Sequence, residues 1–312
     1  MAGNNQFFLR TAHLYSTYRC LICLLIKCTM KQILSVKYCT PAFFLLLLLS
    51  CGKGKGGSNV EQPEPPVQVT GAKIKVMTYN IHIGNPPSKP AGIVDLPAIA
   101  AVIKAQDPDL VALQEVDVNT NRSGTSLDEA KELARLTGMN YFYTKAIDYD
   151  GGQFGDAVLS RFPILESKRY ELPVTAKLGG ETRSVALITV EKEGQRFLFA
   201  STHLDHLTAE DNRMLQATEL VKIVKTFTLP LIIAGDFNAT PMSNPLTILR
   251  QELSWGCKSS CPLTFSAQKP GSTIDYVMMR PAEKFNVLSY VTVNESYASD
   301  HLPLVTEIQL VK

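Results

Sequence analysis

The sequence predicts an α/β protein in which two mixed β-sheets pack together with helices outside, a four-layer α/β/β/α sandwich. Strand-like and helix-like segments alternate through residues 72–312 in two similar halves. Some neighbouring strands are separated by helices and others by short turns, which indicates mixed pairing. Several apolar runs are followed directly by polar residues. In α/β proteins this pattern is typical of buried strands whose ends carry functional side chains at one edge of the sheet.

The first half begins with a strand over residues 73–83, in which apolar side chains alternate with others. The first helix is predicted after Asp95, which can cap it, and has a proline in its first turn. A short buried strand over residues 110–113 follows. The second helix is predicted over residues 126–137, with Ser126 as its N-cap and a glutamate three residues later.

Five strand-like segments follow one another in the middle of the domain. The turns that separate them are short, so neighbouring strands are predicted to pair in antiparallel fashion. The segments cover residues 140–147, 156–160, 164–172, 183–191 and 196–202.

The second half contains the longest predicted helix, over residues 208–227, with Thr208 and Asp211 as a capping box. An apolar run then starts at Leu231 and stops at Gly235, which predicts a buried strand with polar residues at its exit. The remaining predicted elements are a helix over residues 245–253, a loop-rich stretch over 255–271 and strands over 272–279, 287–293 and 303–310.

The pattern of the first fifty residues predicts an export signal. Basic residues precede a short apolar run that is too short to span a bilayer. The run ends in Leu48-Leu49-Ser50-Cys51, which resembles a bacterial lipobox, so Cys51 is predicted to be lipidated and to anchor the protein at the cell envelope, on the periplasmic or outer-membrane side. Met30 is an alternative start. A signal anchor and a cleaved, unlipidated signal remain open alternatives.

Residues 51–71 are rich in glycine and proline, which predicts a flexible tether. Residues 72–312 have the length of a single α/β domain, which is expected to be monomeric. The whole chain has a net charge of +2, but residues 1–50 contain five basic and no acidic residues. Their removal leaves 26 of the 31 basic residues against 29 acidic ones, a net charge of −3. This charge does not favour a dedicated nucleic-acid-binding protein.

Two cysteines, Cys257 and Cys261, remain after the signal segment and Cys51. In an oxidising compartment they could form a disulfide, and two free thiols are the alternative. Two thiols without further ligands at suitable spacing do not make a zinc site.

Six predicted strand ends carry polar residues that suit catalysis. In chain order they are Asn80, Glu115, His203, Asp236 with Asn238, Asp275, and Asp300 with His301. The motifs that contain them are Thr78-Tyr79-Asn80, Leu113-Gln114-Glu115-Val116, Thr202-His203-Leu204, Gly235-Asp236-Phe237-Asn238, Ile274-Asp275-Tyr276 and Ser299-Asp300-His301, with Leu159-Ser160-Arg161 between the second and third.

This ordered set resembles the endonuclease/exonuclease/phosphatase superfamily, which includes DNase I, abasic-site endonucleases, inositol polyphosphate phosphatases and neutral sphingomyelinases. The resemblance extends over about residues 74–310. It implies metal-dependent hydrolysis of a phosphate ester, with Mg²⁺ or Mn²⁺ offsetting the negative charge that repels an attacking water. Glu115 is predicted to be the main metal ligand, assisted by Asn80 and, by the resemblance, Asp300.

The other motif residues are assigned to the chemistry of the phosphoryl group. Asp236 is predicted to orient or deprotonate water, and Asn238 to hold the phosphate or the transition state. A protonated His301 would bind a phosphoryl oxygen, with Asp275 fixing its tautomer and raising its basicity. His203 would stabilise charge or protonate the leaving oxygen.

Two further residues bear on the substrate. Arg183 is predicted to contact it, because it opens a strand expected to run toward the site. Asp156 stands where relatives usually have asparagine, so it must either face away from the phosphate or alter substrate preference. The substrate alternatives are nucleic acid, a phospholipid or sphingomyelin head group, and an inositol phosphate. A catalytically inactive module that binds a phosphorylated ligand or a partner is the competing function.

Overall fold

The computed structural model describes residues 71–175, 177–257 and 260–312. The predicted signal segment over residues 1–50, the lipidation of Cys51 and all but the last residue of the tether lie outside the described residues. Each helix in the described ranges is too short or too polar to cross a membrane.

The first sheet contains six strands in the order β11-β12-β1-β2-β4-β3. β1 and β2 run parallel and the other neighbours pair antiparallel. The strands are β1 (Lys73–Asn80), β2 (Leu110–Val118), β3 (Asn140–Tyr149), β4 (Gly152–Ser160), β11 (Phe285–Thr292) and β12 (Leu304–Leu310).

The second sheet also contains six strands, in the order β5-β6-β7-β8-β10-β9. Here β7 and β8 are the parallel pair, and the other neighbours are antiparallel. The strands are β5 (Glu166–Leu172), β6 (Arg183–Lys192), β7 (Gln195–His203), β8 (Leu231–Asp236), β9 (Ser254–Trp255) and β10 (Asp275–Arg280).

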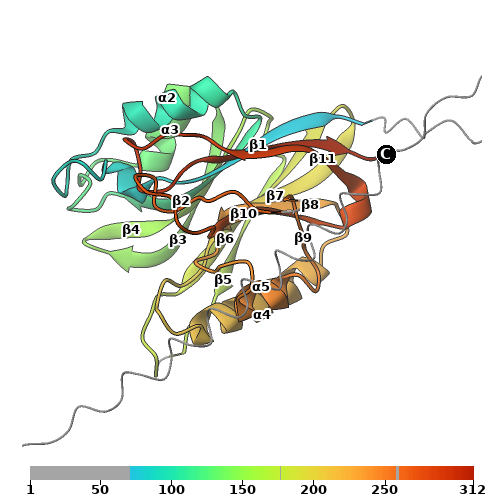
Figure 1. Ribbon diagram of the computed structural model, residues 1–312. Coiled ribbons are helices and arrows are strands. Elements are labelled where there is room, and N and C mark those ends of the chain that lie inside the picture. The colour runs from blue at the N-terminus through green and yellow to red at the C-terminus, as the bar shows by residue number, and fades with distance from the viewer. Residues whose placement is uncertain (1–70, 176, 258–259) are drawn as a thin grey trace, which may run out of the picture. The chain divides into compact units, whose positions relative to one another are not determined.

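Helices cover the outer faces of the two sheets, as Figure 1 shows. The pair α2 (Leu96–Gln106) and α3 (Glu129–Thr137) packs on the first sheet, and the pair α4 (Asp211–Lys225) and α5 (Asn244–Leu249) packs on the second. Two short 3₁₀ helices, His82–Gly84 and Ala282–Lys284, lie in connections. The predicted four-layer α/β/β/α sandwich of two mixed sheets is therefore confirmed.

Three apolar clusters hold the layers together. The central one lies between the sheets, where Val76 and Val158 of the first sheet meet Phe199 and Ile232 of the second. The outer clusters lie between each sheet and its helices. Because the central strands are buried on both faces, they appear in the sequence as nearly continuous apolar runs. Each large side chain that becomes fully buried stabilises the fold by about 1.5–3 kcal/mol.

Two helix starts differ from their predictions. α3 begins at Glu129, and its N-cap is Asp128, whose side chain accepts a hydrogen bond from the backbone N–H of Lys131. Ser126 lies in the preceding turn. α4 begins at Asp211 without a side-chain cap, so the predicted box with Thr208 is wrong. The guanidinium of Arg213 donates hydrogen bonds to the backbone carbonyls of Asp205, Leu207 and Thr208, just before the helix. These hydrogen bonds hold the segment in a loop conformation, so the helix does not start at Thr208.

One of the predicted antiparallel pairings is also wrong. β4 and β5 follow each other closely in the chain but lie in different sheets, since the link at Phe162-Pro163 crosses from the first sheet to the second. The pairings of β3 with β4, β5 with β6 and β6 with β7 are antiparallel as predicted. A short turn alone does not distinguish a hairpin from a crossing between packed sheets.

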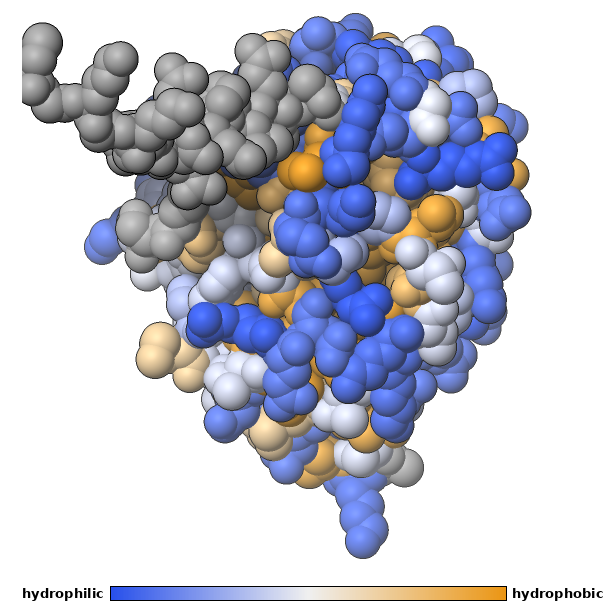
Figure 2. All heavy atoms as spheres, turned by 90° about the vertical axis from the view of Figure 1, so that its right-hand side faces the viewer, coloured by the Kyte–Doolittle hydropathy of each residue, from blue (hydrophilic) through white to orange (hydrophobic). Residues whose placement is uncertain are grey.

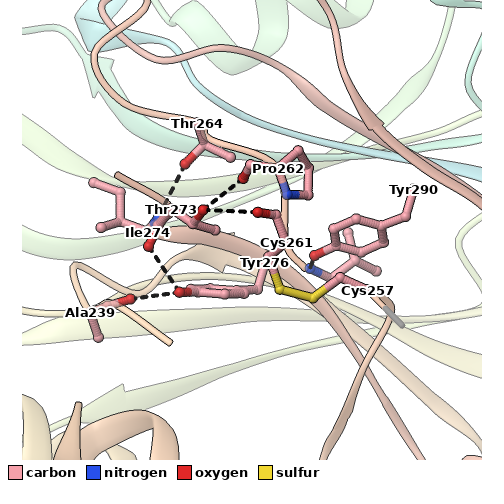
Figure 3. The surroundings of a disulfide bond; sticks show 10 residues. Ala239, Cys257, Cys261, Pro262, Thr264, Thr273, Ile274, Tyr276 and Tyr290 are labelled. Carbon is pink, nitrogen blue, oxygen red and sulfur yellow. Dashed lines mark hydrogen bonds between the residues drawn. A yellow bond between two sulfur atoms is a disulfide. The ribbon is translucent and has the colours of Figure 1, made fainter. Parts of the chain in front are cut away.

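Cys257 and Cys261 form a disulfide within the connection from β9 to β10, with their Cα atoms 5.1 Å apart. Figure 3 shows the hydrogen bonds around it. The hydroxyl of Thr273 donates to the carbonyl of Pro262 at 2.7 Å, and that of Tyr276 donates to the carbonyl of Ala239 at 2.9 Å. The sequence left a disulfide and two free thiols as alternatives, and the structure contains the disulfide.

Figure 2 shows the end of the domain where β1 begins and β12 ends. Hydrophilic residues cover most of the surface that is not drawn in grey, and apolar residues lie scattered among them. The strand ends that carry the predicted site lie at the opposite end of these two strands.

Candidate active site

The predicted site residues converge on one pocket of about 340 Å³. Six of them line it directly: Glu115, His203, Asp236, Asn238, Asp300 and His301. Asn80 and Asp275 are buried and hydrogen-bond to lining residues. Arg183 also lines the pocket. Both sheets contribute, so the pocket lies where their strand ends meet.

Two of the lining residues have unusual backbone conformations. Glu115 has a φ of 56° and lies at an irregularity in β2, between Leu113 and Val116, where pairing with β4 shifts. Asn238 has a φ of 47° just after β8. A non-glycine residue in this region costs roughly 1–3 kcal/mol, less for asparagine, and such strain gathers at functional sites. The shift in β2 ends the regular alternation of side chains where Glu115 enters the pocket.

Asn80 joins the two sheets inside the site. Its Nδ2 donates to Glu115 Oε1 at 3.0 Å and to Asp236 Oδ2 at 3.1 Å. Its Oδ1 accepts from the backbone N–H of His82 at 3.1 Å. The Asn80 side chain is fully buried, and its amide therefore holds the carboxylates of Glu115 and Asp236 close to each other.

His301 forms a buried pair with Asp275, whose Oδ2 lies 2.9 Å from His301 Nδ1. His301 Nε2 lies 3.6 Å from Asp236 Oδ2. Burial by itself would lower the pKa of His301, but the carboxylates of Asp275 and Asp236 outweigh it and raise the pKa to about 10. The imidazole is therefore cationic at neutral pH.

Asp236 lies at the centre of these contacts. Its Oδ1 accepts from the backbone N–H of Asn238 at 2.8 Å, and its Oδ2 accepts from Asn80. Burial and the nearby Asp275 carboxylate raise the pKa of Asp236 to about 7, although His301 opposes the shift. A carboxyl group that titrates near neutrality suits general base catalysis.

His203 stays neutral for two reasons. It is buried, and its Nδ1 lies 3.3 Å from Nη1 of Arg183. Burial, followed by the positive charge of Arg183, lowers the pKa of His203 well below its usual value. Its Nε2 lies 2.9 Å from Asn238 Nδ2.

Arg183 is the first residue of β6, and this strand runs away from the pocket. The predicted direction, toward the site, is therefore wrong. β6 is antiparallel to β7, whose last residue is His203, so the start of one strand lies beside the end of the other.

The donor set fits a divalent cation. Glu115 and Asp300 line the same pocket and offer carboxylate oxygens, which Mg²⁺ and Mn²⁺ prefer. Asn80 was predicted to assist as a ligand, but it faces Glu115 with its Nδ2, while its Oδ1 accepts from the backbone N–H of His82, so in this arrangement it positions Glu115. A second group of candidate ligands, Asp236, Asp275 and His301, has its ligand atoms within 4.8 Å of one another. There the protonated His301 cannot donate a lone pair, so the carboxylates are the better ligands.

Several lining residues were not identified from the sequence. They are Tyr149, Phe154, Glu181, Phe265 and Ile274, and Arg122 and His206 also line the pocket. A weak signal existed for two of them, because Tyr149 and Phe154 flank the Asp150-Gly151 turn between β3 and β4. Nothing in the local pattern relates that turn to the strand ends.

Asp156 lies between the two sheets and is not among the described residues that line the pocket. The hydroxyl of Ser184 donates to its Oδ2 at 2.6 Å, whereas its Oδ1 has no hydrogen-bond partner in the described part of the chain. Burial raises the pKa of Asp156 to about 7, which Ser184 and Arg183 only partly oppose. Of the two alternatives for this residue, it faces away from the phosphate site.

Replacing Asp156 with Asn is expected to reduce the loss of folding stability that occurs as the pH rises toward 7. Between its ordinary pKa of 3.8 and about 7, folded Asp156 keeps a proton that the unfolded chain releases. Asp156 therefore contributes a fall in stability as the pH rises toward 7, by roughly 4 kcal/mol at most. Asn removes this contribution and leaves those of Asp236 and Glu129, whose pKa values are also raised. Urea denaturation at pH 5 and pH 8 with EDTA measures the difference. Asp148→Asn, at an exposed position, is the control and should follow the wild type, and an unchanged slope in Asp156→Asn would contradict the assignment.

The fold and the pocket together define a DNase I-like α/β protein with an acidic, amide and histidine site at its strand ends. The chain belongs to the endonuclease/exonuclease/phosphatase family, whose model matches residues 77–301. This family consists in general of hydrolytic phosphoesterases that are typically dependent on divalent metals. The resemblance seen in the sequence motifs is thereby confirmed at the level of the family.

Known proteins similar to this chain include one sequence relative and two solved structures. YbhP of Escherichia coli K12, an uncharacterized protein, is 28% identical over 261 residues, covering 78% of this chain and 100% of YbhP. An endonuclease/exonuclease/phosphatase from Beutenbergia cavernae has a TM-score of 0.66 at 26% identity and covers 77% of this chain and 72% of that one. The mannosyl-6-phosphatase Bt3783 of Bacteroides thetaiotaomicron has a TM-score of 0.62 at 21% identity, with 75% and 99% coverage, a likeness of fold alone.

Proposed function

We propose that this protein is an exported, metal-dependent phosphoesterase that hydrolyses a phosphate ester, preferentially a diester, by attack of water. One observation carries the proposal. The buried amide of Asn80 ties a candidate metal ligand, Glu115, to a carboxyl that titrates near neutrality, Asp236, and Asp236 lies beside the cationic His301. Ligand, base and positive charge thus meet in one pocket.

Glu115 and Asp300 would hold Mg²⁺ or Mn²⁺, and Asn80 would position the Glu115 carboxylate through its Nδ2. The cation would supply positive charge that offsets the repulsion between the phosphate oxygens and an incoming water. The backbone shift at Glu115 and the hydrogen bond from Asn80 fix the Glu115 carboxylate before the ligand arrives. Such preorganisation reduces the reorganisation needed during the reaction.

Asp236 would accept the proton of the water that attacks phosphorus. The cationic His301 would donate a hydrogen bond through Nε2 to a phosphoryl oxygen, while Asp275 holds Nδ1. Asn238 would hold the phosphoryl group or the transition state. The lowered pKa of His203 means that its imidazole is neutral. His203 would therefore act as a hydrogen-bonding group and would not donate a proton from a cationic ring.

The location of the protein is part of the proposal. The lipobox-like Leu48–Cys51 supports a lipid anchor at the cell envelope, which would place the pocket outside the cytoplasm. Nucleic acid, phospholipid head groups and inositol phosphates are all phosphate esters that such a site could hydrolyse. The net charge of −3 after removal of residues 1–50 makes nucleic acid the least favoured of them.

The experiment measures hydrolysis of bis(p-nitrophenyl) phosphate and p-nitrophenyl phosphate with Mg²⁺, with Mn²⁺ and with EDTA. Glu115→Ala is expected to lower kcat by at least ~100-fold, because it removes the main ligand of the cation that would stabilise negative charge in the transition state. Glu283→Ala, an exposed acid in the second 3₁₀ helix, is the matched control and should keep full activity.

Two outcomes contradict the proposal. Full activity in EDTA would show that no divalent cation is needed. Full activity of Glu115→Ala at low metal concentration would remove this residue from the site. Binding of phosphate esters without any turnover would instead favour the competing function, an inactive phosphoryl-binding module.

A further inference from the structure

One segment of the pocket wall has no task in the hydrolysis described above. It covers residues 261–274, between the disulfide and β10, and we call it the 261–274 segment. Its first residue, Cys261, is bonded to Cys257 just after β9. Further along, Phe265 and Ile274 line the pocket. The segment therefore connects the second sheet to the side of the pocket where Asp275 and His301 lie.

Thr264 joins the backbones that carry Asp275 and His301. Its hydroxyl accepts hydrogen bonds from the backbone N–H groups of Ile274 at 3.1 Å, drawn in Figure 3, and of Asp275 at 3.2 Å. Its carbonyl accepts from the backbone N–H of Leu302 at 2.8 Å, directly after His301. Thr264 is fully buried, so water does not compete for these hydrogen bonds. The segment thus fixes the backbones of the pair relative to each other.

Phe265 packs its ring against the imidazole of His301. The two ring centres are 4.9 Å apart, and the ring planes are inclined by 48°. This tilted arrangement lies within the range of about 4.5–7 Å that aromatic pairs prefer. The backbones of the two residues also form a β-bridge, and the N–H of Ala267 donates to the carbonyl of Asp300 at 2.6 Å. Phe265 is therefore held beside His301 by its own backbone.

The ring contact restrains what a hydrogen bond alone leaves free. Asp275 Oδ2 lies 2.9 Å from Nδ1 of His301. One hydrogen bond tolerates some tilt of the imidazole plane, because hydrogen bonds form over a spread of angles. A neighbouring ring in contact with the imidazole limits this tilt. The direction of Nε2, on the far side of the imidazole, is then set by Asp275 and Phe265 together.

We propose that Phe265 is a positioning residue, which holds the imidazole plane of His301 so that Nε2 is directed at a phosphoryl oxygen. Phe265 acts through His301, so the inference rests on the role proposed for His301 in the phosphoesterase reaction. Because Phe265 also lines the pocket, the competing role is direct contact with the substrate. Loss of positioning slows every ester by the same factor in kcat, whereas loss of a substrate contact raises KM and depends on the ester.

Phe265→Leu removes the ring and keeps an apolar side chain. It is expected to lower kcat roughly tenfold at saturating Mg²⁺, with KM nearly unchanged. The factor should be the same for bis(p-nitrophenyl) phosphate and methyl p-nitrophenyl phosphate, which share a leaving group. Phe265→Tyr keeps the ring and should retain most of kcat. Phe227→Leu is the matched control and should keep full activity, because this half-buried ring packs on Tyr170 and is not among the residues that line the pocket.

Two measurements separate positioning from a general loosening of the fold. Adding Phe265→Leu to His301→Gln should slow His301→Gln no further, because the ring acts only through the imidazole. The proton on Nδ1 of His301 gives an NMR signal that is identified by its absence from His301→Gln. This signal is expected in the wild type and in Phe265→Tyr, and faster exchange with water should weaken it in Phe265→Leu. The NMR measurement does not depend on turnover.

The outcomes separate the positioning role from the hydrolytic function. Wild-type kcat in Phe265→Leu overturns the positioning role, as does a loss that Phe265→Tyr shares or a loss that differs between the two esters. If the wild type hydrolyses neither ester but the Nδ1 signal weakens as expected, the positioning of His301 stands and the hydrolytic function fails. If the wild type hydrolyses both esters and Phe265→Leu equals it, the function stands and the positioning role fails.

Discussion

Replacing Asp236 with Asn is expected to lower kcat by roughly 10²–10⁴-fold, the range for loss of a general base. Asn keeps the shape of the side chain, but its single acceptor oxygen can keep only one of the hydrogen bonds from Asn80 and Asn238, and it cannot take a proton from water. Steady-state hydrolysis at saturating Mg²⁺ measures the loss. Substrate binding by the variant, followed by calorimetry, should persist, which separates a chemical defect from a folding defect.

The same residue predicts the pH dependence of the wild type. The active form of Asp236 is the carboxylate, and its pKa is about 7, so kcat/KM should rise with pH through this region. A bound divalent cation favours the carboxylate and shifts this limb to lower pH. The limb should be missing from the residual activity of Asp236→Asn. A variant that kept both wild-type kcat and the acidic limb would exclude Asp236 as the base.

Replacing His301 with Gln is expected to lower kcat by roughly 10²–10³-fold, because one charged donor to the phosphoryl oxygens is lost. Asp275→Asn tests the cause of the charge. Without the Asp275 carboxylate, the burial of His301 lowers its pKa, so activity should decline as the pH rises past the new value. Wild-type His301, with a pKa of about 10, stays cationic throughout the neutral range.

The double variant His301→Gln with Asp275→Asn checks that the two residues act as a pair. If Asp275 acts only through His301, the double variant should be no slower than His301→Gln alone. Independent, multiplying losses would contradict the pairing. Asp211→Asn, at the exposed start of α4, serves as the control for a change of one carboxylate.

Much of the site could be predicted because its signals are local. An apolar run followed by a polar residue marks a strand end, and Asn80, Glu115 and Asp236 each follow such a run. The order of these motifs in the chain indicated the family, while the alternation of strands and helices in two halves indicated the four-layer fold. The fold is confirmed, while the chemical roles of the residues stay predictions.

Other features depend on contacts that a local pattern does not contain. The loop before α4 exists because Arg213 reaches its carbonyls, so a capping box with Thr208 looked equally acceptable in the sequence. The backbone shift at Glu115 depends on how β2 pairs with β4. The stacking of Arg122 on Tyr149 depends on a turn that packs beside a different strand.

The bridge made by Asn80 has a consequence for folding. Asn80 and Asp236 are 156 residues apart in the chain, and the bond from Ser299 to the backbone of Asn80 spans 219. Contacts between such distant segments are slow to form. The pocket cannot exist until the two sheets have docked, so recovery of catalysis during refolding would report this docking step, while circular dichroism would register strands and helices that form earlier.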